Sequence, residues 1–158
     1  MMDTVPHIEE LENSEYFFRL FCRFEFAIKK SGVLLIDPDR ALRRAEIDWV
    51  EFSRNLPEQF FGQVAEMGVC PTILSEPPKR QVVDQNRKLI WQDVQRPQNT
   101  QMLFECLRNI RNNLFHGGKS GDPTNKPRNE TLIAEGIRLI EFTLDVQDEL
   151  RLHFNGGD

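Results

Sequence analysis

The stretch TQMLFECLRNIRNNLFHGGK, residues 100–119, reads as one helix followed by a stop, and it decides the predicted fold. Thr100 offers an N-terminal cap, and Gly117 with Gly118 ends the helix near Phe115. Apolar residues recur at three- and four-residue steps, which is the periodicity of a helix with one buried face. They are Leu103, Leu107, Ile110 and Leu114.

Two more long helices are predicted near the ends of the chain. Residues 8–30 repeat apolar side chains at helical steps, and Gly32 then provides a stop. Residues 130–153 carry apolar side chains around a wide arc, which is typical of a deeply packed helix. With the helix over Thr100–Phe115, they form the frame of a helical bundle.

Shorter helices are predicted between them. Asp37 and Pro38 supply a cap and a helix-compatible proline before a helix over residues 40–55. Pro57 opens a third, shorter helix that runs to about Met67.

Other parts of the middle of the chain read as connectors. The apolar run at residues 33–36 is too short to show whether it forms a strand or a connector, and we expect a connector. Prolines interrupt residues 69–99, where a helical turn or two is expected only around residues 86–93. The sequence thus predicts an all-α fold, a single helical domain over residues 1–158 with about four to six helices and an irregular, proline-rich central connector.

Length and composition limit the classes of protein that fit. A chain of 158 residues can bury one core and is too short for two domains. The acidic N-terminal region does not resemble a secretory signal. The most apolar stretch, residues 17–28, is interrupted by Arg19, Arg23 and Glu25, and a bilayer core needs about 20 apolar residues. We expect a cytoplasmic protein without a membrane partner.

The three cysteines are Cys22, Cys70 and Cys106. Their number is odd and their spacing is wide, so neither a disulfide scaffold nor a structural zinc site is indicated. We expect reduced, at least partly buried core residues, and no metal.

Positive charge is concentrated around the end of the central helix. The net charge of −5 argues against a protein coated in positive charge for non-specific nucleic-acid binding. Between residues 108 and 128, however, five basic residues stand against Asp122 alone, a local surplus of four. The five are Arg108, Arg111, Lys119, Lys126 and Arg128.

The polar residues of the central helix have recognisable chemical uses. Glu105, Arg108, Asn112 and His116 line up roughly opposite the apolar stripe, and we expect them to face solvent or another subunit. An imidazole can exchange a proton near neutral pH, and a guanidinium offers donors matched to phosphate oxygens. The same residues can also have purely structural roles: His116 can cap the helix end, and Arg108 can be an ordinary solvated residue.

Arg111 and His116 lie five residues apart, about 140° around an ideal helix. They do not meet within one straight helix. Either the helix unwinds before Gly117, or two copies of the chain face each other.

The segment Arg111-Asn112-Asn113-Leu114-Phe115-His116 closely resembles the signature of HEPN domains, in which an arginine lies four to six residues before a histidine. His7 and His153 have no arginine at this spacing. The long helix before the motif, the polar loop and the closing helix extend the resemblance, which residues 33–99 do not share. In detail the segment looks most like small HEPN proteins associated with plasmids and mobile elements.

The resemblance implies a dimer in which two motifs meet in one cleft, and a metal-independent ribonuclease without a cofactor. His116 would assist attack of a ribose 2′-hydroxyl on the adjacent phosphorus, and Arg111 would stabilise the phosphoryl charge. Asn112 would position the histidine or the phosphate. The other basic residues of the segment would bind RNA phosphates: Arg108, Lys119, Lys126 and Arg128.

The resemblance also implies a toxin–antitoxin or phage-defence setting with an antitoxin protein as partner. Some HEPN toxins have a tyrosine two residues after the histidine as a target for AMP transfer, but Gly118 occupies that position here. Two alternatives remain open: a non-catalytic HEPN module that binds RNA, a nucleotide or a protein, and a structural dimer in which Arg111 pairs with an acidic residue.

Overall fold

Helix α1, Ser14–Lys30, is amphipathic and buries one aromatic face. The computed structural model describes residues 11–40, 42–115 and 125–157. The helix predicted over residues 8–30 is therefore correct from Ser14 onward, and residues 8–10 lie outside the described part. The buried residues of α1 are Phe17, Leu20, Phe21, Phe24, Ala27 and Ile28.

Helix α5, Thr100–Phe115, has the predicted bounds, and its predicted apolar stripe faces the core. The predicted cap was wrong by one residue. The Asn99 side chain accepts a hydrogen bond from the Met102 N–H at 2.9 Å, so Thr100 is already helical. An amide oxygen one residue earlier satisfies the free N–H of the first turn.

The closing segment is two helices, whereas one was predicted over residues 130–153. Helix α6, Lys126–Val146, begins earlier than predicted, with Pro127 in its first turn. Gln147 has an extended backbone, and α7, Asp148–Phe154, then turns back against α1. The Arg23 guanidinium donates to the Phe154 carbonyl at 2.6 and 3.0 Å, which ties α7 to α1.

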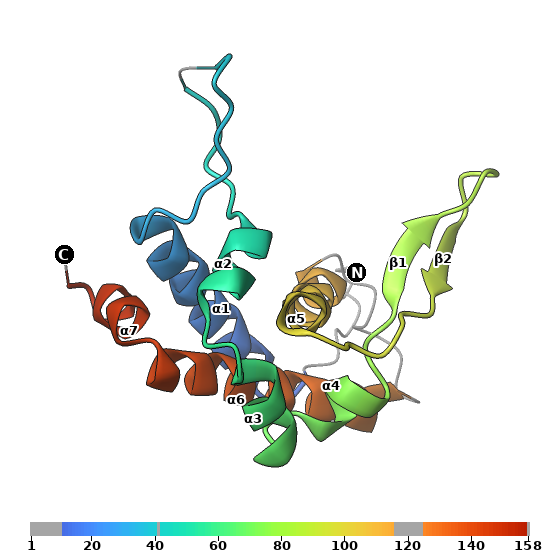
Figure 1. Cartoon of the computed structure of the whole chain (residues 1–158). Helices are drawn as coiled ribbons and strands as arrows, with labels where there is room; N and C mark the ends of the chain where they lie inside the picture. Colours follow the sequence, from blue (N-terminus) through green and yellow to red (C-terminus); the bar gives the residue numbers. More distant parts are fainter. Residues whose placement is uncertain (1–10, 41, 116–124, 158) are drawn as a thin grey trace, which may run out of the picture.

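The helix predicted over residues 40–55 is limited to α2, Trp49–Asn55. The Asp48 side chain caps α2 by accepting from the Glu51 N–H at 3.0 Å, and Asp37 does not cap it. Residues 31–40 and 42–48 leave the helical body as an extended excursion (Figure 1).

Most of this excursion has no core to cover, although Ile47 near its end is buried. A single bridge joins Leu34 to Ile47, and Leu42 is 96% exposed. An apolar helical face is stabilised by burial, which this part of the chain does not provide. The connector expected at residues 33–36 is confirmed apart from that bridge.

Two short helices follow. Helix α3, Phe60–Glu66, lies within the predicted Pro57 to Met67 helix, and α4, Pro71–Ser75, was not predicted. The N-terminus of α4 is capped from α6, because the buried Glu135 carboxylate accepts from the Thr72 and Ile73 N–H groups at 2.8 and 3.0 Å.

Residues 86–93 do not form helical turns, contrary to the prediction. Strands β1, Arg80–Val83, and β2, Leu89–Gln92, pair antiparallel with Arg80 opposite Gln92 and Val83 opposite Leu89. β-branched and aromatic residues on both sides of a polar turn favour a hairpin. Figure 1 shows this hairpin projecting from the helical body beside α5.

The core is centred on Phe104 of α5, which is fully buried. Its ring lies 5.1 to 6.3 Å, between centroids, from aromatic rings of α1, α2 and α3. Such pairs add to the free energy of area burial. The neighbouring rings belong to Phe24, Trp49, Phe52 and Phe60.

Cys70 and Cys106 are buried, but Cys22 is exposed, so the expectation of burial was wrong for Cys22. Burial raises the pKa of Cys70 and of Cys106 to about 12. Both thiols therefore stay protonated at neutral pH and act as small core residues.

The described residues form seven helices and one two-stranded sheet. The chain is thus mostly helical, compatible with the predicted all-α class, although the helices exceed the four to six expected and the connector contains a hairpin. None of the described helices is both long and apolar enough for a membrane span.

We expect Phe104→Ala to lower the free energy of unfolding by about 3 to 5 kcal/mol, because it removes the ring shared by four helices and leaves a cavity. Phe104→Leu should cost roughly 1 to 2 kcal/mol. Urea denaturation followed by circular dichroism measures both, with the exposed Met67→Ala as control. Equal losses for all three variants would contradict a core centred on this ring.

Candidate functional site

Arg111 projects from the last turns of α5 toward α1. Its Nη1 lies 3.3 Å from Oε1 of Glu25, and its guanidinium lies over the Phe21 ring, 5.0 Å from the centroid. The Arg111 and Glu25 side chains are 26% and 22% exposed. Arg111 is therefore held by a partly buried carboxylate and a ring, yet remains accessible from solvent.

Arg108 lies one turn earlier and packs against α2. Its guanidinium is 5.0 Å from the centroid of the Trp49 ring, which itself stacks on Phe104. The prediction that Arg108 faces solvent was therefore correct only in part, because its side chain is partly buried. Burial lowers the pKa of Arg108, and nearby Arg111 lowers it further while Glu105 and Glu25 oppose the shift.

A polar hollow of about 580 Å³ lies between α5 and the base of the hairpin. From α5 it is lined by Glu105, Arg108, Asn109 and Asn112, and from the hairpin side by Arg80, Gln92, Asp93, Val94 and Gln95. Its size is within the range of small-molecule pockets, and amide and guanidinium groups dominate its lining. Such groups can bind phosphates and the edges of bases.

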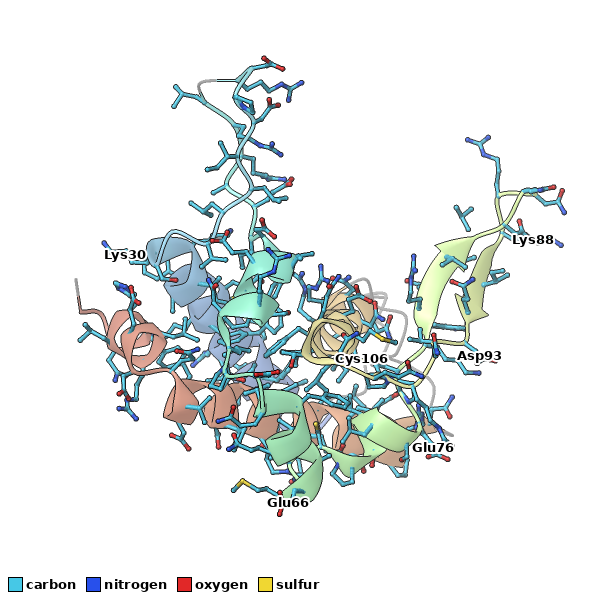
Figure 2. The ribbon with its side chains drawn as sticks, in the orientation of Figure 1. Lys30, Glu66, Glu76, Lys88, Asp93 and Cys106 are labelled. Carbon is cyan, nitrogen blue, oxygen red and sulfur yellow. The ribbon has the colours of Figure 1, made fainter. Side chains whose placement is uncertain are left out.

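The hairpin base is fixed to α5 by Asn113. This buried amide donates from Nδ2 to the Lys79 carbonyl at 2.9 Å. Figure 2 shows the start of the hairpin beside α5, with Asp93 labelled at the base and Lys88 far from the helical body. The two sides of the hollow are thus joined by a hydrogen bond as well as by the chain.

The predicted motif residues are only partly brought together among the described residues. Asn112 is exposed and lines the hollow, whereas Arg111 faces α1. Arg108 lies between the two faces, close enough to Arg111 for their charges to interact. His116 and Lys119 lie outside the described residues, so the predicted Arg111–His116 pair stays a prediction.

Arg128 and Lys126, predicted to bind phosphate, lie elsewhere. Arg128 donates from Nη2 to the Glu76 and Pro77 carbonyls at 2.8 and 3.1 Å, and so ties α6 to the end of α4. The Lys126 Nζ lies 3.8 Å from Oε1 of Glu130, beside the start of α1. Neither residue lines the hollow on α5.

Sequence reasoning missed the residues that hold the two guanidiniums. Glu25 was noted as a charged residue within the most apolar stretch of the chain, but it was not linked to Arg111. Trp49 lies within the helix predicted over residues 40–55, but its contact with Arg108 was not predicted. Arg80 and Gln92 were missed because the hairpin was not predicted.

Within residues 11–40, 42–115 and 125–157, no group of three or more metal-ligating side chains is arranged to hold a metal ion. Searches of protein-family models, of curated proteins and of solved structures return no match to this chain.

A double-mutant cycle tests the contact between Arg111 and Glu25. We expect Arg111→Ala, Glu25→Ala and the double variant to give a coupling energy of about 0.5 to 1.5 kcal/mol, because both side chains are partly shielded from solvent. Urea denaturation supplies the four free energies. The same cycle on the exposed Arg19–Glu15 pair should give a smaller coupling, and equal values would show that the Glu25 contact is no better than a surface pair.

Proposed function

We propose that this chain is a metal-independent endoribonuclease of the HEPN type. The proposal rests on the guanidinium groups of Arg108 and Arg111, which contacts with aromatic rings hold in place. Both residues belong to α5, the helix that precedes His116 in the sequence. Both are fixed by contacts with rings, which reduces the entropy lost when they bind a phosphate. Asn112 adds an exposed amide on the same helix.

In the proposed reaction, a ribose 2′-oxygen forms a bond to the adjacent phosphorus and the bond from phosphorus to the 5′-oxygen breaks. His116 takes the proton of the 2′-hydroxyl, and a general acid returns one to the leaving 5′-oxygen. Arg111 stabilises the negative charge that develops on the phosphoryl oxygens. The products are a 2′,3′-cyclic phosphate and a 5′-hydroxyl.

A homodimer would bring the separated motif groups together. Helix α1 exposes an apolar stripe formed by Phe18, Cys22 and Phe26, which recur every four residues beside Glu25. Phe18 and Phe26 are 43% and 59% exposed. Exposed apolar stripes of this kind mark association surfaces, and a second copy on this stripe would bring two Arg111 residues toward one cleft.

One observation favours a second candidate, a non-catalytic HEPN module that binds RNA, a nucleotide or a protein. The contact of Arg111 with Glu25 joins α5 to α1, so this arginine has a structural use without catalysis. This module would retain the hollow and the basic residues but would not cleave RNA.

The proposed setting is a cytoplasmic toxin–antitoxin or phage-defence system, with RNA as substrate and an antitoxin protein as inhibitor. The motif resemblance supports this setting.

Cleavage of a fluorescent single-stranded RNA in excess chelator tests the nuclease. We expect His116→Ala and Arg111→Ala to reduce the rate by about 10²- to 10⁴-fold, the usual range for a lost proton-transfer or charge-stabilising group. Arg19→Ala, at an exposed arginine of α1, is the matched control and should cleave at the wild-type rate. The products should accept a 5′-phosphate from a kinase without prior phosphatase treatment.

Equal cleavage by all four proteins would remove the assignment. Binding of RNA without cleavage by the wild type would instead favour the non-catalytic module.

Phe26→Glu should dissociate the proposed dimer, because a carboxylate would have to be buried in the apolar contact. Light scattering on a sizing column across a concentration series measures the mass. Met67→Glu, at an exposed apolar residue of α3's C-terminal end, is the control and should leave the mass unchanged. A monomeric wild type, or a dimeric Phe26→Glu variant, would contradict this interface.

A further inference from the structure

The hairpin carries the second concentration of positive charge in the chain. Residues 79–96 contain five basic residues and two acidic ones, a surplus of three in a protein whose net charge is −5. The basic residues are Lys79, Arg80, Arg87, Lys88 and Arg96. All five are exposed, and Lys79 also pairs with Asp93, whose Oδ1 lies 3.6 Å from its Nζ. A local positive field on an acidic protein points to a polyanionic partner.

The turn at the tip of the hairpin is held by hydrogen bonds of Asp84. The Asp84 side chain accepts from the Asn86 and Lys88 N–H groups at 2.7 and 2.9 Å. The Asp84 N–H donates to the Lys88 carbonyl at 2.9 Å and closes the loop. Arg87 and Lys88 are consecutive exposed residues of this turn, and Figure 2 shows Lys88 at the end of the arm, away from the helical body.

Arg87 occupies a backbone position that the turn does not favour for an arginine. Its φ is +63°, in the left-handed region where a three-residue hairpin loop usually has glycine or asparagine. An arginine at this position has a conformational cost that glycine would not have. Such a residue suggests that the guanidinium at the tip has a use beyond the turn.

The two faces of the hairpin offer complementary contacts. Trp91, 38% exposed, lies on one face with Val83 and Leu89. On the other face, Arg80 and Gln92 line the hollow that continues onto Asn109 of α5 and its neighbours. The hairpin thus combines cationic side chains at its tip, an indole that can stack on a base, and amides at its base.

We propose that a single strand of RNA binds across the hairpin Arg80–Gln92, with Arg87 and Lys88 on phosphates, Trp91 of one face stacked on a base, and the hollow on α5, at the other face, occupied by a nucleotide. This surface deepens the proposed function, on which it rests for the choice of RNA as substrate. The hollow would take a nucleotide next to the motif, and its amides would contact the base edge.

An acidic protein partner is the competing class, and the observations favour RNA over it. A partner recognised only by charge would need neither the exposed indole nor the amide-lined hollow. Aromatic side chains next to cations are the usual means of holding unpaired bases. The hollow also begins where the hairpin meets the helix that carries the motif.

Binding of a fluorescein-labelled 2′-O-methyl RNA, measured by fluorescence anisotropy at several salt concentrations, tests the surface. This probe lacks the attacking hydroxyl, so binding is measured even if the nuclease proposal fails. The test variant is Arg87→Gly with Lys88→Gln, in which glycine suits the turn and an unfolded hairpin cannot explain a loss. Its matched control is Arg19→Gln with Arg151→Gln, the same charge change on α1 and α7.

We expect the hairpin variant to bind roughly tenfold more weakly, and the slope of log Kd against log salt to fall by about 1.4, since each phosphate contact on a single strand contributes about 0.7. Trp91→Leu should weaken binding about tenfold without changing that slope, because stacking releases no counterions. The control variant should match the wild type.

Three results would overturn the proposal. They are absence of RNA binding by the wild type, equal losses in the hairpin and control variants, and binding of polyglutamate as tight as that of RNA. The last result would indicate the acidic protein partner.

Discussion

The packing of aromatic rings around Phe104 is the constraint on which the fold and the site both depend. This ring joins α5 to α1, α2 and α3, and Trp49 stacks on it at 6.2 Å. The guanidinium of Arg108 lies over the Trp49 ring. The position of a candidate phosphate-binding group is therefore set by the rigidity of the core, since close-packed rings leave little freedom for rotation.

The sequence predicted the elements whose periodicity is long enough to be unambiguous. Helix α5 was predicted over its full length, because four apolar residues at helical steps specify one buried face. The excursion at residues 31–40 and 42–48 could not be predicted, since Asp37-Pro38 and Asp48 are equally good local caps and only tertiary burial decides between them. The hairpin was missed because its apolar runs are short and its turn lacks the glycine that usually signals one.

The candidate site was predictable as a set of residue types and not as an arrangement. Arg108, Arg111 and Asn112 were singled out on one helix, and the structure divides them between the α1 side and the hairpin side. Arg128 was counted with them because of its charge, but its guanidinium binds carbonyls at the end of α4. The spacing of residues along the chain does not indicate that Glu25 of α1 and Trp49 of α2 contact the guanidinium groups of Arg111 and Arg108. These partners follow from packing, which a local pattern does not encode.

The contact of α1 with α7 has a consequence for the order of folding. The hydrogen bonds between Arg23 and the Phe154 carbonyl join residues 131 positions apart, and α1 also packs on α6. Phe24 of α1 meets its partners Trp49 and Phe52 early in synthesis, but the contacts of α1 with α6 and α7 cannot form until these late segments have left the ribosome. Closing so long a loop is entropically costly, and topologies rich in distant contacts fold slowly. Phe17, which lies against Gly136 of α6, therefore stays without that partner through most of synthesis.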